Sequence, residues 1–136
     1  MLQKLCVVVL VALVSGLIMT GGRSEEPAKH PTPRVIKLDA GGKDYVPLLS
    51  GPPETVTMHS GLVTLAPGKS VGRHSTKDNE EILVILEGQG EYRITGGPTL
   101  RAQAGEAVYC PPQREHDMVN VGQGPLRYVY VVAKAG

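Results

Sequence analysis

Residues 68–88 read GKSVGRHSTKDNEEILVILEG, and this stretch carries the most information about the structure. Its first half contains His74 and is rich in glycine and small polar residues, so it favours turns. Its second half, Glu81–Leu86, is a short apolar run with several β-branched residues, which predicts a β-strand. Because side chains alternate along a strand, Glu81 shares one face with Leu83 and Ile85.

The sequence leaves open which of two neighbouring glutamates points into the protein. Glu80 shares the opposite face of this strand with Ile82 and Val84, so both faces are apolar. A shift of one residue in strand pairing would exchange the two faces. An inward carboxylate is costly unless it is paired or binds a metal ion. The inward glutamate is therefore a candidate for chemistry, and the outward one is expected to be solvated.

The rest of the chain predicts many short strands and no long helix. Glycine and proline are abundant, at 17 and 11 residues, and short apolar runs alternate with turn signals. No stretch after residue 24 keeps the apolar period of a helix. With no internal repeat, this pattern predicts an all-β fold built as one sandwich or barrel. The expected strands are Val35–Leu38, Tyr45–Leu49, Thr55–Leu65, Glu81–Leu86, Gly90–Ile94, Ala107–Cys110, Asp117–Val121 and Leu126–Val132.

The first 24 residues have the pattern of a secretory signal peptide. Lys4 precedes the apolar run Leu5–Ile18, and small and polar residues follow it. The run is shorter than the roughly 20 residues that a spanning helix needs, so cleavage is expected, with an uncleaved membrane anchor as the alternative. The prediction is an exported protein, periplasmic or extracellular, with no membrane segment in its mature form. We divide the chain into signal peptide 1–24, a proline-containing linker 25–34 and one domain, 35–136.

Charge and cysteine content narrow the possible partners. The formal net charge is +1, which provides no basic field for nucleic acid. Cys6 would leave with the signal peptide, so Cys110 would have no partner for an intrachain disulfide. We expect Cys110 to be a buried, inert thiol. A redox or ligand role is the alternative, because Cys110 lies at a strand end.

The stretch 68–88 resembles the first motif of the cupin superfamily, G-x5-H-x-H-x3–4-E-x6-G. Gly68, His74, Glu81 and Gly88 fall at the required spacings. Thr76 stands where the family has its second histidine.

Residues 105–120 resemble the second cupin motif, G-x5-P-x-G-x2-H-x3-N. Gly105, Pro111, His116 and Asn120 match it, and Gln113 replaces its middle glycine. The two motifs occur in the family's order and at a separation that bacterial cupins allow. Together they cover residues 68–120.

The resemblance implies a double-stranded β-helix barrel, or jelly roll, with a metal ion inside. Carried over by position, His74, Glu81 and His116 would be the metal ligands. Thr76 would occupy the remaining ligand position, where a hydroxyl is a poor ligand for a first-row metal. Two histidines and one carboxylate suit a divalent metal, Fe, Mn, Zn or Ni, and ligand type does not choose among them. The resemblance also implies a small-molecule ligand and a homodimer formed through an edge strand.

Two classes of function follow. The first is a metal-dependent enzyme acting on a small molecule, for example an oxygenase or isomerase. The alternative is a non-catalytic ligand-binding or sensor cupin with a degenerate metal site. The sequence does not decide between an enzyme and a binding module, because no general base can be assigned and the catalytic residues are unknown.

Four further side chains near the motifs have minor alternatives. Asp78 could supply a substitute oxygen ligand, although this is not our main expectation. His59 is expected at the surface or in a cross-strand role, with a place in the pocket as the alternative. Arg73 and Arg114 lie close in sequence to candidate ligands, and each is expected to be solvated unless it binds an anionic substrate.

Overall fold

The computed structural model describes residues 31–136. The expected signal peptide and most of the expected linker lie outside these residues. The described part of the chain contains nine β-strands and no helix. No helix there has the length and apolar character needed to cross a membrane. The strands are β1 Tyr45–Ser50, β2 His59–Leu65, β3 His74–Ser75, β4 Asn79–Glu87, β5 Gln89–Ile94, β6 Thr99–Gln103, β7 Ala107–Cys110, β8 Glu115–Asn120 and β9 Leu126–Lys134.

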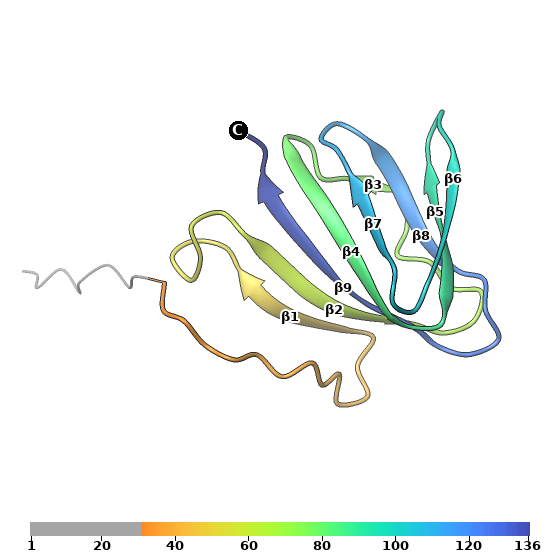
Figure 1. The fold of residues 1–136 in the computed structure, drawn as a ribbon, viewed down its shortest axis with the longest axis horizontal. Coiled ribbons are helices and arrows are strands. Elements are labelled where there is room, and N and C mark those ends of the chain that lie inside the picture. Colours follow the sequence, from red (N-terminus) through yellow and green to blue (C-terminus); the bar gives the residue numbers. More distant parts are fainter. Residues whose placement is uncertain (1–30) are drawn as a thin grey trace, which may run out of the picture.

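The strands form two antiparallel sheets that face each other (Figure 1). One has the order β1-β2-β9-β4-β7 and the other the order β3-β8-β5-β6. Strands distant in sequence are neighbours in both sheets, which is the arrangement of a jelly-roll barrel. The predicted all-β barrel class is therefore confirmed.

Two expected strands differ from the structure at the N-terminal side. Residues 35–38 form no strand, and Val35 is 95% exposed. An apolar run becomes a strand only when another strand pairs with it, and no strand pairs with this one. The expected strand Thr55–Leu65 begins only at His59, because residues 52–57 form turns and bends.

Two short strands were not predicted from the sequence. β6 returns from β5 through the turn at Gly96-Gly97-Pro98, and only Ala102 among its residues is buried. β3 contains two residues and pairs with β8 alone. Neither has an apolar alternation long enough to identify a strand.

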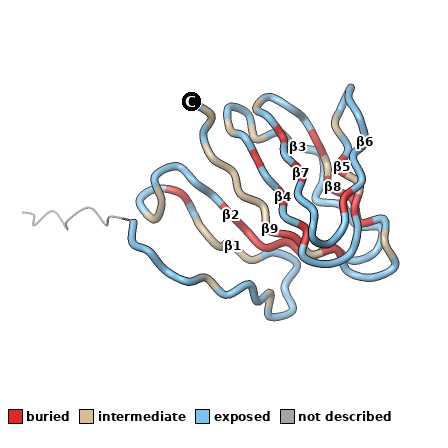
Figure 2. The backbone as a smooth tube through the Cα atoms, viewed as in Figure 1, coloured by how far each residue is buried: buried red, intermediate tan, exposed pale blue. Residues whose placement is uncertain are grey.

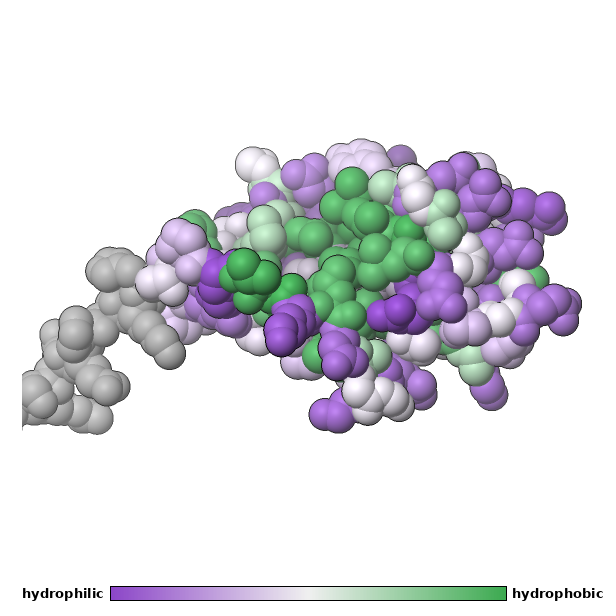
Figure 3. Space-filling model, turned by 60° about the horizontal axis from the view of Figure 1, so that its bottom comes forward, coloured by the Kyte–Doolittle hydropathy of each residue, from purple (hydrophilic) through white to green (hydrophobic). Residues whose placement is uncertain are grey.

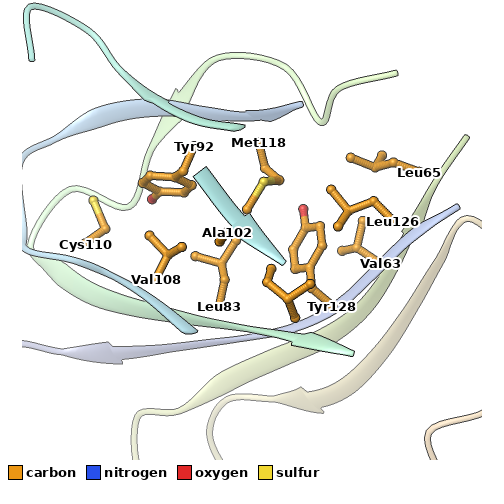
Figure 4. Close-up of a cluster of buried hydrophobic side chains, with 11 residues drawn as sticks. Val63, Leu65, Leu83, Tyr92, Ala102, Val108, Cys110, Met118, Leu126 and Tyr128 are labelled. Carbon is orange, nitrogen blue, oxygen red and sulfur yellow. The ribbon is translucent and has the colours of Figure 1, made fainter. Parts of the chain in front are cut away.

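The core lies between the two sheets. Buried residues recur along the strands of both sheets (Figure 2), and Figure 4 shows the side chains of the buried cluster meeting in the interior. The cluster is Val63, Leu65, Leu83, Ile85, Tyr92, Ala102, Val108, Cys110, Met118, Leu126 and Tyr128.

The turn from β4 to β5 closes one end of this core and depends on Gly88. Its φ is +79°, which side chains rarely adopt. A Cβ at Gly88 would also collide with the carbonyl oxygen of Pro125. This glycine therefore lets the β4–β5 turn pass closely over the chain that enters β9.

The outer face of the five-stranded sheet is also apolar. On β4, Ile82, Val84 and Leu86 point outward and are each about 40% exposed. Apolar residues gather on the face of the molecule that Figure 3 turns to the viewer. Both faces of β4 are thus apolar, although only one packs against the core.

Candidate metal centre

Three side chains from three strands meet between the sheets. His74 on β3 lies opposite His116 on β8 in the antiparallel pairing, and their ring centroids are 4.5 Å apart. Glu81 comes from β4 in the other sheet. One ligand atom from each lies within 4.8 Å of the other two. The structure therefore brings together the three side chains that the cupin motifs single out.

Two of the three side chains in the cluster are buried, and the third is exposed to solvent. His116 is 1% exposed and Glu81 is 6% exposed, whereas His74 is exposed. Alternation along β4 turns Glu81 inward together with Leu83 and Ile85. This settles the choice between the two glutamates that the sequence left open.

Backbone carbonyls orient both imidazole rings. Nδ1 of His74 lies 2.8 Å from the carbonyl oxygen of Gly72, and Nδ1 of His116 lies 2.9 Å from that of Arg114. A carbonyl oxygen only accepts, so in each neutral ring Nδ1 carries the proton and donates it. Nε2 of each ring then keeps a free lone pair, which is the form that binds metal ions.

Nε2 of His116 has an unusual environment. It lies 2.9 Å from Oε2 of Glu81 but forms no well-directed hydrogen bond with it, and Nε2 has no other partner. Two acceptor atoms this close repel each other unless a proton or a cation lies between them. Burial lowers the pKa of His116, but the adjacent Glu81 carboxylate outweighs this effect, so the pKa is raised overall. The pair is therefore suited to hold a positive species, whether proton or metal ion.

Tyr92 on β5 contacts the two buried side chains of the cluster. Its ring stacks on His116 with centroids 4.8 Å apart, and its hydroxyl donates to Oε2 of Glu81 over 3.3 Å. Burial, followed by hydrogen bonding to Cys110 and the charge of Glu81, raises the pKa of Tyr92 far above its ordinary value. Tyr92 therefore stays a donor at neutral pH. No local sequence pattern shows this position, which depends on the pairing of β5 with β8 and on the facing sheet.

Thr76 and Asp78 lie at the rim without joining the cluster. Thr76 lines the pocket, but its hydroxyl donates to the carbonyl oxygen of Asn79 over 2.9 Å. Asp78 is exposed and accepts a hydrogen bond from Gln113. Neither oxygen belongs to the three-residue cluster.

Glu80 and Cys110 are also outside the cluster. Glu80 points outward and accepts a hydrogen bond from the hydroxyl of Tyr109 over 3.1 Å. Cys110 is fully buried, with Sγ 3.5 Å from Nδ1 of His116. That nitrogen is the one already donating to the backbone, so the thiol packs behind the ring.

The remaining candidates face away from the site. His59 is exposed and lies against Gly51 at the end of β1. Arg73 is largely exposed, and its Nε lies 4.0 Å from Oε2 of Glu115. Arg114 contributes only its carbonyl oxygen to the centre.

A pocket adjoins the cluster between the two sheets, and residues of both sheets line it. Its volume is about 370 Å³, within the range of small-molecule sites. Apolar side chains form most of its wall, among them Val63, Val71, Leu83, Met118 and Val132. Four tyrosines complete the wall: Tyr45, Tyr92, Tyr128 and Tyr130.

A double-stranded β-helix that encloses a His/Glu/His cluster is the arrangement of a cupin. The Cupin domain family model matches residues 61–132, and the chain belongs to the cupin superfamily. This match spans β2 to β9 and includes all three residues of the cluster.

Solved structures share this fold. A cupin protein from Bacteroides fragilis is 26% identical over 79% of this chain and 87% of that one, with a TM-score of 0.62. A predicted oxalate decarboxylase from Thermotoga maritima is 26% identical over 67% of this chain and 79% of that one, with a TM-score of 0.62. The cupin domain of Schizosaccharomyces pombe Cnp3 is 21% identical over 67% of this chain and 64% of that one, with a TM-score of 0.60. No curated protein sequence matches the chain.

Proposed function

We propose that this cupin binds a divalent metal ion through His74, Glu81 and His116 and presents it to a small molecule in the pocket. The observation that carries the proposal is the orientation of the imidazoles. Both have their Nδ1 protons committed to backbone carbonyls and both leave Nε2 free, close to a buried carboxylate. Such second partners of the ring are the usual means of fixing a metal-binding histidine.

The donor set fits Fe, Mn, Zn or Ni. Two imidazole nitrogens and one carboxylate are ligands common to these metals, and three protein ligands leave positions open for water or substrate. When bound, the ion would supply Lewis acidity and those open positions. The protein's own part is to orient the two rings, hold the Glu81 carboxylate through the Tyr92 hydroxyl, and exclude water from one side of the site.

The first experiment measures metal content and stability together. Protein purified without chelator or affinity-tag metal should hold about one ion per chain by elemental analysis. His74→Ala and His116→Ala should each lose it. Metal added to the stripped wild type should raise its melting temperature, as expected for a ligand that binds only the folded state. A wild type with no bound ion and no shift on metal addition would exclude a metal site.

An oxygenase or isomerase would use this site as a catalytic centre, and a binding or sensor protein would use it only to hold a ligand. One observation favours binding. Apart from the three cluster residues, the titratable side chains lining the pocket within residues 31–136 are tyrosines, and the pKa values of Tyr92, Tyr128 and Tyr130 are raised. A general base near neutral pH is therefore lacking there. Turnover of a small molecule by metal-loaded protein, lost in Glu81→Gln, would decide for the enzyme.

We also propose that the domain works outside the cytoplasm, as a homodimer. The leader-like pattern of residues 1–24 supports export, and sequencing the N-terminus of protein recovered from cell fractions tests it. An intact Met1 in the membrane fraction would favour the anchor instead. The dimer rests on the family resemblance, and sedimentation equilibrium of the metal-loaded protein tests it.

A further inference from the structure

Beyond the cluster, the pocket walls that residues 31–136 provide have no cationic side chains. None of the lining residues in this part of the chain is lysine or arginine. Its apolar residues and tyrosines can pack against a ligand, but they provide no positive charge to balance an anionic group. A carboxylate or phosphate placed against these walls would lose its hydration without gaining an ionic partner.

The charge of the proposed centre limits what can bind to it. A divalent ion with two neutral imidazoles and one carboxylate carries one net positive charge. One anionic donor from a ligand neutralises it. A second anionic group that does not itself coordinate the ion would have to lie in the apolar part of the pocket, where it would be unpaired.

Two tyrosines form a flat wall of the pocket. The rings of Tyr45 on β1 and Tyr130 on β9 are stacked, with centroids 6.4 Å apart and planes 9° apart. Their hydroxyls are 2.9 Å apart, within hydrogen-bonding distance. Gly61 on β2 makes room for both rings, since a Cβ there would lie 2.7 Å from an atom of each. Aromatic surfaces of this kind favour stacking with another ring.

We propose that the site takes a small oxygen chelator with an uncharged aromatic body, and that it rejects chelators whose body carries a carboxylate or phosphate away from the ion. This inference rests on the proposed metal function. The chelating head would reach the ion, and the ring would pack against the Tyr45–Tyr130 pair and the apolar wall.

Three hydroxamates with one head group test the proposal on metal-loaded protein. Acetohydroxamate carries the head alone, benzohydroxamate adds a neutral ring, and 4-carboxybenzohydroxamate adds a charged ring. By calorimetry, benzohydroxamate should bind about threefold to tenfold tighter than acetohydroxamate, from ring packing. The charged analogue should bind about tenfold or more weaker than benzohydroxamate, because its carboxylate is desolvated without a partner.

Metal analysis of the same sample separates two kinds of failure. If the protein holds no metal, the proposed function fails. If it holds metal but binds the three probes equally, prefers the charged ring or binds none of them, only the present inference fails.

Variants away from the metal ligands locate the contacts. Tyr45→Ala should weaken benzohydroxamate binding about threefold or more while leaving acetohydroxamate binding within about twofold. Tyr45→Phe is the matched control, and it should retain benzohydroxamate binding because it keeps the ring. Val71→Arg places a cation at the partly exposed pocket wall and should tighten binding of the charged analogue. Equal losses for both uncharged probes in Tyr45→Ala, or no gain in Val71→Arg, would overturn the proposed contacts.

Discussion

Two neighbouring glutamates of β4 each accept a hydrogen bond from a tyrosine, on opposite faces of one sheet. Inside the barrel, Tyr92 donates to Glu81 over 3.3 Å, and both residues are buried. Outside, Tyr109 donates to Glu80 over 3.1 Å, and both are exposed. The two pairs have the same chemistry and nearly the same geometry. Only the inner pair lies beside two histidines and out of water, so only there does the carboxylate require a cation.

The same contrast between a buried and an exposed face extends along β4. Leu83 is 2% exposed, whereas Val84 is 39% exposed, although the residues are adjacent. The packing of the second sheet over one face, rather than any difference in residue type, gives the two faces different roles. Matched substitutions across β4 and β7 therefore test how far burial determines function.

The largest effect should come from the two glutamates. Glu81→Gln should weaken metal binding by about 100-fold or more, because a ligand and its charge are lost. Glu80→Gln, which makes the same change on the outer face, should leave affinity within about twofold. Titration of stripped protein with Zn(II) measures both. Similar affinities in the two variants would show that burial does not distinguish these carboxylates.

The next largest effect concerns packing. Leu83→Ala should lower the free energy of unfolding by about 2–5 kcal/mol, because it leaves a cavity in the core. Val84→Ala removes a smaller, partly exposed side chain and should cost less than about 1 kcal/mol. Urea unfolding of both variants without metal gives the comparison. A larger loss for Val84→Ala would mean that something covers the outer face in solution.

A smaller effect is expected at Cys110. Cys110→Ala should lower the free energy of unfolding by about 1 kcal/mol, because it leaves a small cavity. It should leave the metal stoichiometry unchanged. The thiol should react with a disulfide reagent only after unfolding, because it is fully buried. Rapid reaction in the native protein, or loss of metal in the alanine variant, would instead give the thiol a role in the site.

The smallest effect should be seen in the exposed pair, Glu80 and Tyr109. A hydrogen bond to Glu80 raises the pKa of Tyr109, because the carboxylate favours the protonated phenol. Glu80→Gln should therefore lower this pKa toward its ordinary value. An NMR titration that follows the Tyr109 ring in both proteins measures the change. An unchanged pKa would mean that the exposed hydrogen bond is not populated in solution.

Much of the barrel was predictable because its central strands carry their own signals. The predicted strand Ala107–Cys110 coincides with β7, and Leu126–Val132 lies within β9. The two cupin motifs also singled out the three residues that the fold brings together. These three residues are far apart along the chain, so no local sequence pattern shows that they meet. The family resemblance was needed to predict it.

Other features depend on tertiary contacts that one sequence does not contain. The orientation of Glu80 and Glu81 follows from which face of β4 meets the second sheet, and both faces are apolar. The run Val35–Leu38 has the composition of a strand, but no partner strand pairs with it. The role of Tyr92 depends on its position beside His116 across β5 and β8. In each case the decisive partner is distant in sequence.

The shortness of β3 bears on how quickly an ion could leave. His74 lies on a two-residue strand that pairs only with β8, whereas Glu81 and His116 lie on longer strands inside the sheets. Detaching two residues exposes little surface, so this fluctuation should occur far more often than unfolding of the barrel. Exchange with a chelator should then proceed at a rate nearly independent of urea while the protein stays folded. The lifetime of the bound ion would be a property of one strand end rather than of global stability.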